Sequence, residues 1–201
     1  MFCEKFIHQY MLELNFNPFP ELSTERLTLR QLNKDDEHDL FILRSDKGTM
    51  QYIPRTVAKS TEDAAQLIQK MNDLLNKTEA INWAMTLKND SKLIGIIGFF
   101  RIAKEHYRAE VGYMLHPDYR GKGIMQEALV KVLDYGFKSL QFHYIEAVVD
   151  PRNVPSAKLL ERNRFTKAGH FKEREFFNGK FIDSVFYSLL TPVREKNPLQ
   201  E

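Results

Sequence analysis

The segment HPDYRGKGIMQEA, residues 116–128, joins a predicted strand to a predicted helix, and the rest of the fold is worked out around it. Pro117 ends the strand, and Gly121 and Gly123 flank Lys122 where the helix begins. Glycine lets the backbone bend tightly, and the first amides of a helix have no partner within it. Aided by the helix dipole, such amides form an anion site, so this turn predicts a phosphate-binding loop.

Two familiar kinds of phosphate loop do not match these letters. A Walker loop requires Gly-Lys followed by Ser or Thr, whereas Lys122 is followed by Gly123. A dinucleotide fingerprint requires a third glycine where Gln126 stands. The residues alone leave two interpretations open: a loop for another phosphate-bearing ligand, or a glycine-rich turn without a ligand.

Hydrophobic periodicity on both sides of this segment predicts alternating strands and helices. Toward the N-terminus, it predicts a strand over Arg26–Leu32, helices that begin at Asn33 and Ser60, and strands over Asn82–Leu87, Leu93–Ile102 and Glu110–Leu115. Toward the C-terminus, it predicts a helix over Gly123–Leu140, a strand over Ile145–Val149, a helix over Val154–Asn163, and strands over Phe165–Phe177 and Phe181–Leu190 around an Asn178-Gly179 hairpin turn. This order implies a mixed sheet flanked by helices, with parallel strands before and after the Gly123 helix.

The chain divides into three parts. Residues 1–20 form an extension, in which the apolar residues of Met1–Leu14 have helical spacing and the following linker contains Pro18 and Pro20. Residues 21–192 form one domain, which is long enough for a sizeable core. Residues 193–201 form a C-terminal tail.

Composition argues against several functional classes. The chain has 29 Lys and Arg against 27 Asp and Glu, a balance that does not favour nucleic-acid binding. No stretch approaches the roughly 20 apolar residues of a membrane span. The single cysteine, Cys3, cannot form an internal disulfide, which favours a reducing cytoplasm. The histidines lack the spacing of a metal site, so no metal is expected.

Arg120, Gly123 and Met125 resemble the Arg-x-x-Gly-x-Gly/Ala motif with which GNAT acetyltransferases bind the pyrophosphate of acyl-coenzyme A. Met125 replaces a small residue, a variant familiar in the RimJ/RimL-type branch, the N-terminal acetyltransferases of ribosomal proteins. Other stretches similar to that branch are STERLTLR at 23–30, EVGYML at 110–115, NVPS at 153–156 and LLERNRF at 159–165. The resemblance covers about Leu22–Leu190. It implies an α/β (α+β) GNAT fold: a mixed, mostly antiparallel sheet of six to seven strands flanked by four helices, with an extra N-terminal helix.

The resemblance implies acetyl-CoA as the co-substrate. The loop residues Arg120, Gly121, Lys122, Gly123, Ile124 and Met125 would hold its pyrophosphate. In the family, the strand corresponding to Glu110–Leu115 is bulged and splays from the next parallel strand. Main-chain groups of Tyr113, Met114 and Leu115 would therefore hold the pantetheine arm, and one amide would face the thioester oxygen. Asn153 would cap a helix and also meet the pantetheine arm.

The resemblance also implies the catalytic groups. Ser156 takes the place of a hydroxyl that interacts with the leaving sulfur, as proton donor or thiolate stabiliser. Two glutamates compete for the general base. Glu175 corresponds to the base proposed for the branch, and Glu110 to a position that other members use through a water. We favour Glu175, because a catalytic carboxyl needs partial burial and the aromatic Phe176 and Phe177 lie beside it in sequence.

By resemblance, the protein is an acetyl-CoA-dependent N-acetyltransferase that works by direct attack in a ternary complex. The expected acceptor is a primary amine, the α-amino group of a ribosomal-protein-like N-terminus. A small amine such as a polyamine or an aminoglycoside is an alternative, and so is a catalytically silent module that binds acyl-CoA. A monomer or a homodimer is expected. Acidic residues near the acceptor region, Glu62, Asp63, Glu173 and Glu175, would attract a cationic acceptor.

Overall fold

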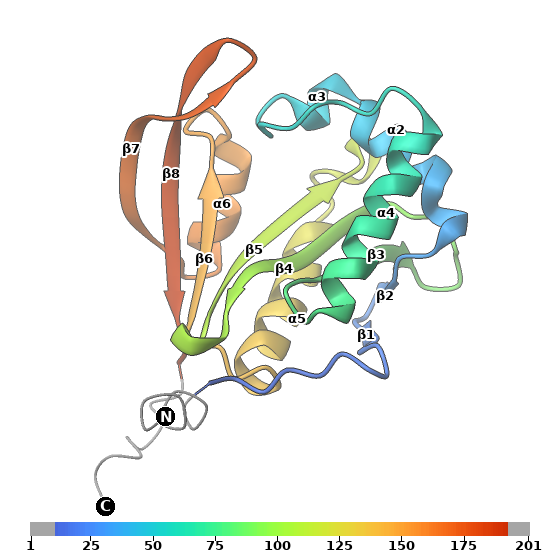
Figure 1. Ribbon diagram of the computed structural model, residues 1–201, viewed down its shortest axis with the longest axis horizontal. Helices are drawn as coiled ribbons and strands as arrows, with labels where there is room; N and C mark the ends of the chain where they lie inside the picture. Colours follow the sequence, from blue (N-terminus) through green and yellow to red (C-terminus); the bar gives the residue numbers. More distant parts are fainter. Residues whose placement is uncertain (1–10, 193–201) are drawn as a thin grey trace, which may run out of the picture.

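One mixed sheet of eight strands organises residues 11–192, the part of the chain that the computed structural model describes. The strands follow the order β1-β2-β3-β4-β5-β6-β8-β7 across the sheet (Figure 1). They are β1 Leu22–Ser23, β2 Leu27–Gln31, β3 Ile81–Leu87, β4 Gly95–Ala103, β5 Arg108–Leu115, β6 Tyr144–Val149, β7 Thr166–Phe177 and β8 Lys180–Leu190. All neighbours are antiparallel except β5 and β6, which are parallel as predicted.

Helices cover both faces of this sheet (Figure 1). The helices α2 Glu37–Ser45, α3 Lys47–Met50 and α4 Thr61–Asn76 lie over one face, and α5 Ile124–Lys138 and α6 Val154–Arg162 over the other, while 3-10 turns cover Lys34–Asp36, Lys104–His106 and Pro117–Tyr119. Successive residues of a strand face opposite sides, and β3 shows this directly. Trp83 and Met85 belong to the core under α5, whereas Ala84 belongs to the core under α2 and α4.

The strands and helices predicted for residues 21–192 are recovered, with two additions. β1 pairs with β2 through Leu22 and Ser23, and it brings the sheet to eight strands rather than six or seven. Two residues are too few for an alternating pattern to reveal a strand. α3 is a fifth helix beside the four that were predicted, and its four residues carry no amphipathic stripe. The mixed, mostly antiparallel sheet flanked by helices is confirmed.

β5 and β6 pair along part of their length and then separate. Their pairing runs from Arg108 with Tyr144 to Glu110 with Glu146, whereas β4 stays paired with β5 as far as Leu115. The residues of β5 after Glu110 therefore have a free edge on the side of β6 (Figure 1). The expected splay is present. The expected bulge lies in β4 instead of β5. The register of β4 shifts between Phe100 and Ala103, and Arg101 in this stretch has a φ of 51°.

Residues 11–20 cover one end of the core in an extended path. Leu12 and Phe16 are buried, with 8% and 5% of their surface exposed. The Leu12 amide donates to the Lys104 carbonyl at 3.2 Å. The indole Nε1 of Trp83 donates to the Pro20 carbonyl at 2.7 Å. These contacts attach the linker to the domain through both apolar packing and backbone hydrogen bonds.

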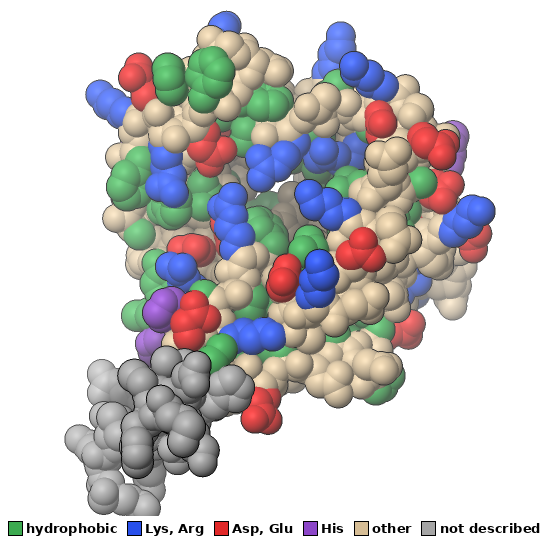
Figure 2. Space-filling model, in the orientation of Figure 1, with side chains coloured by type: hydrophobic (Ala, Val, Ile, Leu, Met, Phe, Trp, Pro, Cys, Tyr) green, Lys and Arg blue, Asp and Glu red, His purple; other side chains and the backbone are tan. Residues whose placement is uncertain are grey.

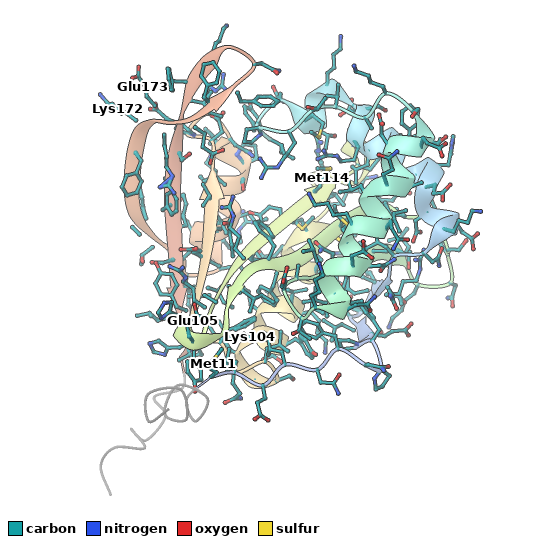
Figure 3. The ribbon with its side chains drawn as sticks, in the orientation of Figure 1. Met11, Lys104, Glu105, Met114, Lys172 and Glu173 are labelled. Atoms are coloured by element: carbon teal, nitrogen blue, oxygen red, sulfur yellow. The ribbon has the colours of Figure 1, made fainter. Side chains whose placement is uncertain are left out.

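In Figure 3, Met11 lies beside Lys104 and Glu105 at the turn between β4 and β5. Residues 11–14 are not helical, although the predicted helix over Met1–Leu14 includes them. The rest of that predicted helix, residues 1–10, and the whole predicted tail, residues 193–201, lie outside the described residues.

We expect Phe16→Ala to lower the free energy of unfolding by about 3 kcal/mol, because it leaves a cavity at a buried aromatic position. Phe181→Ala is the matched control: Phe181 is 64% exposed in β8. Its change should stay within about 0.5 kcal/mol. Urea unfolding followed by the fluorescence of the single tryptophan measures both variants. Equal values for the two would show that the N-terminal segment adds nothing to the core.

Candidate active site

The glycine loop presents free amides at the start of α5. Gly121 and Gly123 have φ values of 72° and 74°, which side-chain-bearing residues rarely adopt. Gly123 is the N-cap of α5, and no side chain caps that end. The side chains of Ile124 and Met125 point into the core, with 4% and 8% exposed, so these residues can offer a ligand their amides. This geometry is that of an anion-binding helix N-terminus.

A network of side chains holds this loop against the turn between β1 and β2. The Glu127 carboxylate accepts from Thr24 Oγ1 at 2.5 Å and from the Arg26 amide and Nε at 2.8 and 2.6 Å. Arg26 Nη1 also donates to the Lys122 carbonyl at 2.9 Å. Although burial acts to raise it, these hydrogen bonds hold the pKa of Glu127 below its usual value. Glu127 is the one carboxylate in the first turn of α5, and Arg26 neutralises its charge. The nearby amides can therefore bind an anion without repulsion from Glu127.

Arg120 makes its contacts away from the loop amides. Its Nη2 donates to Thr49 Oγ1 at 2.6 Å, and both Nε and Nη2 donate to the Leu115 carbonyl at 3.2 Å. The Thr49 hydroxyl in turn donates to Asp46, whose pKa is lowered, chiefly by that hydrogen bond. The Arg120 amide is bonded to Pro117. The Arg120 guanidinium therefore joins the glycine loop to α3.

Strand geometry shows which main-chain groups face the gap between β5 and β6. The amide of His116 donates to the Ile94 carbonyl, on the β4 side. Because main-chain groups of an antiparallel strand alternate sides, those of Met114 also face β4. Those of Tyr113 and Leu115 face the gap, and so do those of Val111. Tyr113, Met114 and Leu115 are the residues predicted to hold a pantetheine arm by their main-chain groups. The groups of Tyr113 and Leu115 face the gap, and those of Met114 do not. Val111 was not predicted.

A hydroxyl pair lies on the α5 and α6 side of this gap. Ser156, in the first turn of α6, is 9% exposed, and its amide donates to Asn153 Oδ1 at 3.2 Å. Asn153 is thus the N-cap, as predicted. The Ser156 Oγ lies 2.9 Å from the Tyr113 hydroxyl. Burial raises the pKa of Tyr113 to about 12, so this phenol stays protonated at any ordinary pH.

Three carboxylates gather on the other side of the gap. Side chains alternate faces along β5, so Glu110 lies on the same face of the sheet as Met114. Met114 packs on the core under α2 and α4. Glu110 is 5% exposed, and its Oε2 accepts from Arg101 Nη1 at 2.7 Å. Burial raises the pKa of Glu110; Arg101 acts to lower it, and the nearby Glu146 and Glu175 raise it further. The charges of Glu146 and Glu175 both act on Glu110, so these three carboxylates form an electrostatically coupled cluster that contains both predicted bases.

The surface over the gap is hollowed. Figure 2 shows a hollow near the middle of the molecule, with Lys and Arg side chains on its rim and Asp and Glu side chains close by. Met114 lies nearby, toward the end of β5 (Figure 3). Lys172 and Glu173 lie on β7 at a distance from it (Figure 3). Glu173, one of the acidic residues predicted for the acceptor region, lies away from the hollow in this view (Figure 3), and its amide donates to Asp183.

Sequence reasoning missed three contributors to this site. Glu146 is a polar residue in a short apolar strand, a signal that could have been noticed. Arg101 reaches Glu110 through an irregularity of β4 that no local pattern predicts. The hydroxyl of Tyr113 was overlooked because the family resemblance directed attention to its backbone. Among residues 11–192, no group of three or more side chains could hold a metal ion, and no helix is long and apolar enough to cross a membrane.

Comparisons with known proteins agree on one family. Residues 26–166 match the family model described as an acetyltransferase (GNAT) domain. The chain is 40% identical to the uncharacterized N-acetyltransferase p20 of Bacillus licheniformis, over 84% of this chain and 95% of the relative. The structure of a ribosomal-protein-S5-alanine acetyltransferase from Vibrio fischeri superposes with a TM-score of 0.77 at 26% identity, covering 88% of this chain and 100% of that one. A spermidine N-acetyltransferase from Vibrio cholerae, in complex with CoA and spermine, gives 0.74 at 26% identity, covering 84% and 97%.

Proposed function

Since the chain belongs to the GNAT acetyltransferase family and is an N-acetyltransferase, we propose that it moves the acetyl group of acetyl-CoA to the α-amino group of a protein N-terminus. One observation carries the proposal: the buried Ser156 hydroxyl and the buried Glu110 carboxylate lie on opposite sides of the gap between β5 and β6. A proton acceptor on one side and a donor on the other are what direct attack of an amine on a thioester requires.

The residues around the gap fit acetyl-CoA. The free amides at Gly123 suit the pyrophosphate, and Lys122 adds a positive charge at the same loop. The unpaired edge of β5 offers amides and carbonyls to the amide-rich pantetheine arm, much as a neighbouring strand would. Acetyl-CoA supplies an acetyl thioester, which is the acylating group. The likeness to a CoA-bound spermidine acetyltransferase supports this assignment.

The chain's own residues then perform three tasks. Glu110 accepts the proton of the acceptor ammonium, directly or through one water, and its raised pKa makes it a stronger proton acceptor than an ordinary glutamate. An amide of Tyr113 or Leu115 donates to the thioester oxygen as negative charge develops there, without any rearrangement of the protein. The Ser156 hydroxyl donates to the sulfur as it leaves. Glu175, a neighbour of Glu110 in the cluster, is the alternative base.

A protein N-terminus is favoured as acceptor by the likeness to a ribosomal-protein-S5-alanine acetyltransferase over 88% of the chain. A hydroxyl on α6 is also the donor that the RimJ/RimL-type resemblance implies. Polyamine acetylation is the second candidate. A specific observation favours it: the charges of Glu146 and Glu175 both act on Glu110, and Arg101 is ion-paired with Glu110. A multiply charged amine would be attracted to such a cluster.

A panel of amines tests the proposal. Release of free CoA thiol is followed with peptides that begin with Ser or Ala, the same peptides with a blocked N-terminus, spermidine, and an aminoglycoside. We expect turnover with the free peptides and none above background with the blocked ones. Faster turnover with spermidine would replace the first candidate with the second. Calorimetric binding of CoA without turnover on any amine would identify a silent module and overturn the proposal.

A further inference from the structure

The hydroxyl pair on the α6 side of the gap contains a group that the proposed mechanism has not used. Tyr113 is on β5 and Ser156 on α6, and 43 residues of sequence separate them. Their hydroxyl oxygens lie 2.9 Å apart, a normal hydrogen-bond distance. Since Ser156 is 9% exposed, its hydroxyl needs a protein partner, and Tyr113 is that partner.

A serine hydroxyl can donate one hydrogen and accept others. If Tyr113 donates to Ser156 Oγ, the serine hydrogen is free to point toward the gap. If Ser156 donated to Tyr113 instead, the serine would have no hydrogen left for a leaving thiolate. The first arrangement matches the role of Ser156, and it is always available because Tyr113 remains protonated well above neutral pH.

We propose that Tyr113 is a positioning residue for the leaving-group step: its hydroxyl donates to Ser156 Oγ and thereby directs the serine hydrogen at the departing sulfur. The inference rests on the proposed role of Ser156. When the C–S bond breaks, its electron pair stays on sulfur, and the sulfur takes the Ser156 proton. Ser156 Oγ regains a proton, relayed through solvent, from the amine nitrogen that has formed the new C–N bond, and Tyr113 keeps its own proton throughout.

The chemistry of α6 explains why a strand tyrosine is needed. Residues 154–162 read VPSAKLLER, and Ser156 is the one hydroxyl in that helix. One turn later, Leu160 is fully buried, so the helix presents an apolar side chain there. The hydrogen bond at Ser156 Oγ comes from another element instead. β5 supplies it at the residue whose main chain also faces the gap.

A double-mutant cycle tests the inference: Tyr113→Phe, Ser156→Ala and the double variant, each with kcat, KM, CoA affinity and melting temperature measured. We expect Tyr113→Phe to lower kcat about 3- to 10-fold, the effect of one lost hydrogen bond, with CoA affinity unchanged within about twofold. Ser156→Ala should lower kcat about 10- to 100-fold. The double variant should equal Ser156→Ala within about twofold, because Tyr113 acts through the serine.

Tyr135→Phe is the matched control, since this tyrosine of α5 packs edge-on against Trp83 in the core, and it should leave kcat unchanged. Wild-type kcat in Tyr113→Phe would overturn the inference. So would losses that multiply in the double variant, or a Tyr113→Phe loss confined to CoA affinity or melting temperature, which is a packing effect. A double variant with the same kcat as Tyr113→Phe, together with a smaller kcat loss in Ser156→Ala, would mean that the serine acts through the tyrosine, and it would overturn the inference. If wild type acetylates no amine, the proposed function itself fails.

Discussion

Glu110→Gln is expected to lower kcat by about 10²–10⁴-fold and to leave the affinity for CoA nearly unchanged. The amide has the shape of the carboxylate but cannot accept a proton. The loss should shrink as pH rises, because more of the acceptor amine is then already deprotonated. Rates of thiol release across a pH series, with CoA affinity by calorimetry, measure both effects.

Glu175→Gln is the decisive companion, because the sequence alone favoured Glu175 as the base. The structure gives Glu110 the deeper burial and the raised pKa, so we expect the loss for Glu175→Gln to be much smaller. Removing one neighbouring negative charge lowers the pKa of Glu110, which should move the acidic limb of the rate profile slightly to lower pH. A large, pH-rescued defect in Glu175→Gln with a near-normal Glu110→Gln would instead make Glu175 the base.

Arg101→Gln tests the same assignment by changing the pKa of Glu110 in the opposite sense. The guanidinium lowers the pKa of Glu110, so its removal should raise that pKa and move the acidic limb to higher pH. Lys138→Gln is a matched control, because it removes a cation that is ion-paired with Asp134 at the far end of α5. An acidic limb that stays in place in Arg101→Gln would mean that a group other than Glu110 controls it.

The expected loss in Glu110→Gln is not an unfolding effect. A carboxyl whose pKa is raised on folding binds its proton more tightly in the folded state, so its contribution to stability falls as pH rises from the unfolded pKa through the folded one. Above that window the buried charge is a net cost, partly offset by Arg101. The glutamine variant should therefore be as stable as wild type, or more stable, at neutral pH. Proteins often keep such costs at functional sites.

The sequence predicted those features that depend on local pattern. Gly121 and Gly123 indicated the loop, and the strand-helix-strand order around them indicated the parallel β5 and β6. Asn153 was identified as a cap from its place before Pro155. Each of these depends on a few neighbouring residues, so each can be read without knowing the rest of the fold. The family model and the structural likeness confirm the GNAT fold that the resemblance implied.

What could not be predicted depends on register and on side chains from distant segments. The direction of the Met114 backbone follows from which residues of β5 bond to β4, and the loop motif carries no such information. The hydrogen bond between the Arg120 guanidinium and Thr49 joins residues 71 positions apart, and the loop motif does not predict it. Likewise, the contact between Tyr113 and Ser156 exists because β5 and α6 meet in space. Periodicity within either element does not report on it.

Gly123→Asp is expected to weaken coenzyme binding by about a thousandfold. A carboxylate about 4 Å from a phosphate oxygen costs about 4 kcal/mol at an effective dielectric constant of 20. The first carbon of the new side chain would also lie 3.4 Å from Nη2 of Arg26, which braces the loop. Calorimetry with CoA measures the loss, and the melting temperature checks the fold.

Gly179→Asp is the matched control for backbone strain. Gly179 has a φ of 77° against 74° for Gly123, and a side chain there would meet open space. Both variants place a side chain in the left-handed region, which costs about 1–2 kcal/mol of stability. They differ in that one charge lies at the loop and the other at the hairpin between β7 and β8. We therefore expect similar losses of melting temperature but wild-type CoA affinity in Gly179→Asp. If Gly123→Asp also kept wild-type affinity while folded, the pyrophosphate would have to bind elsewhere.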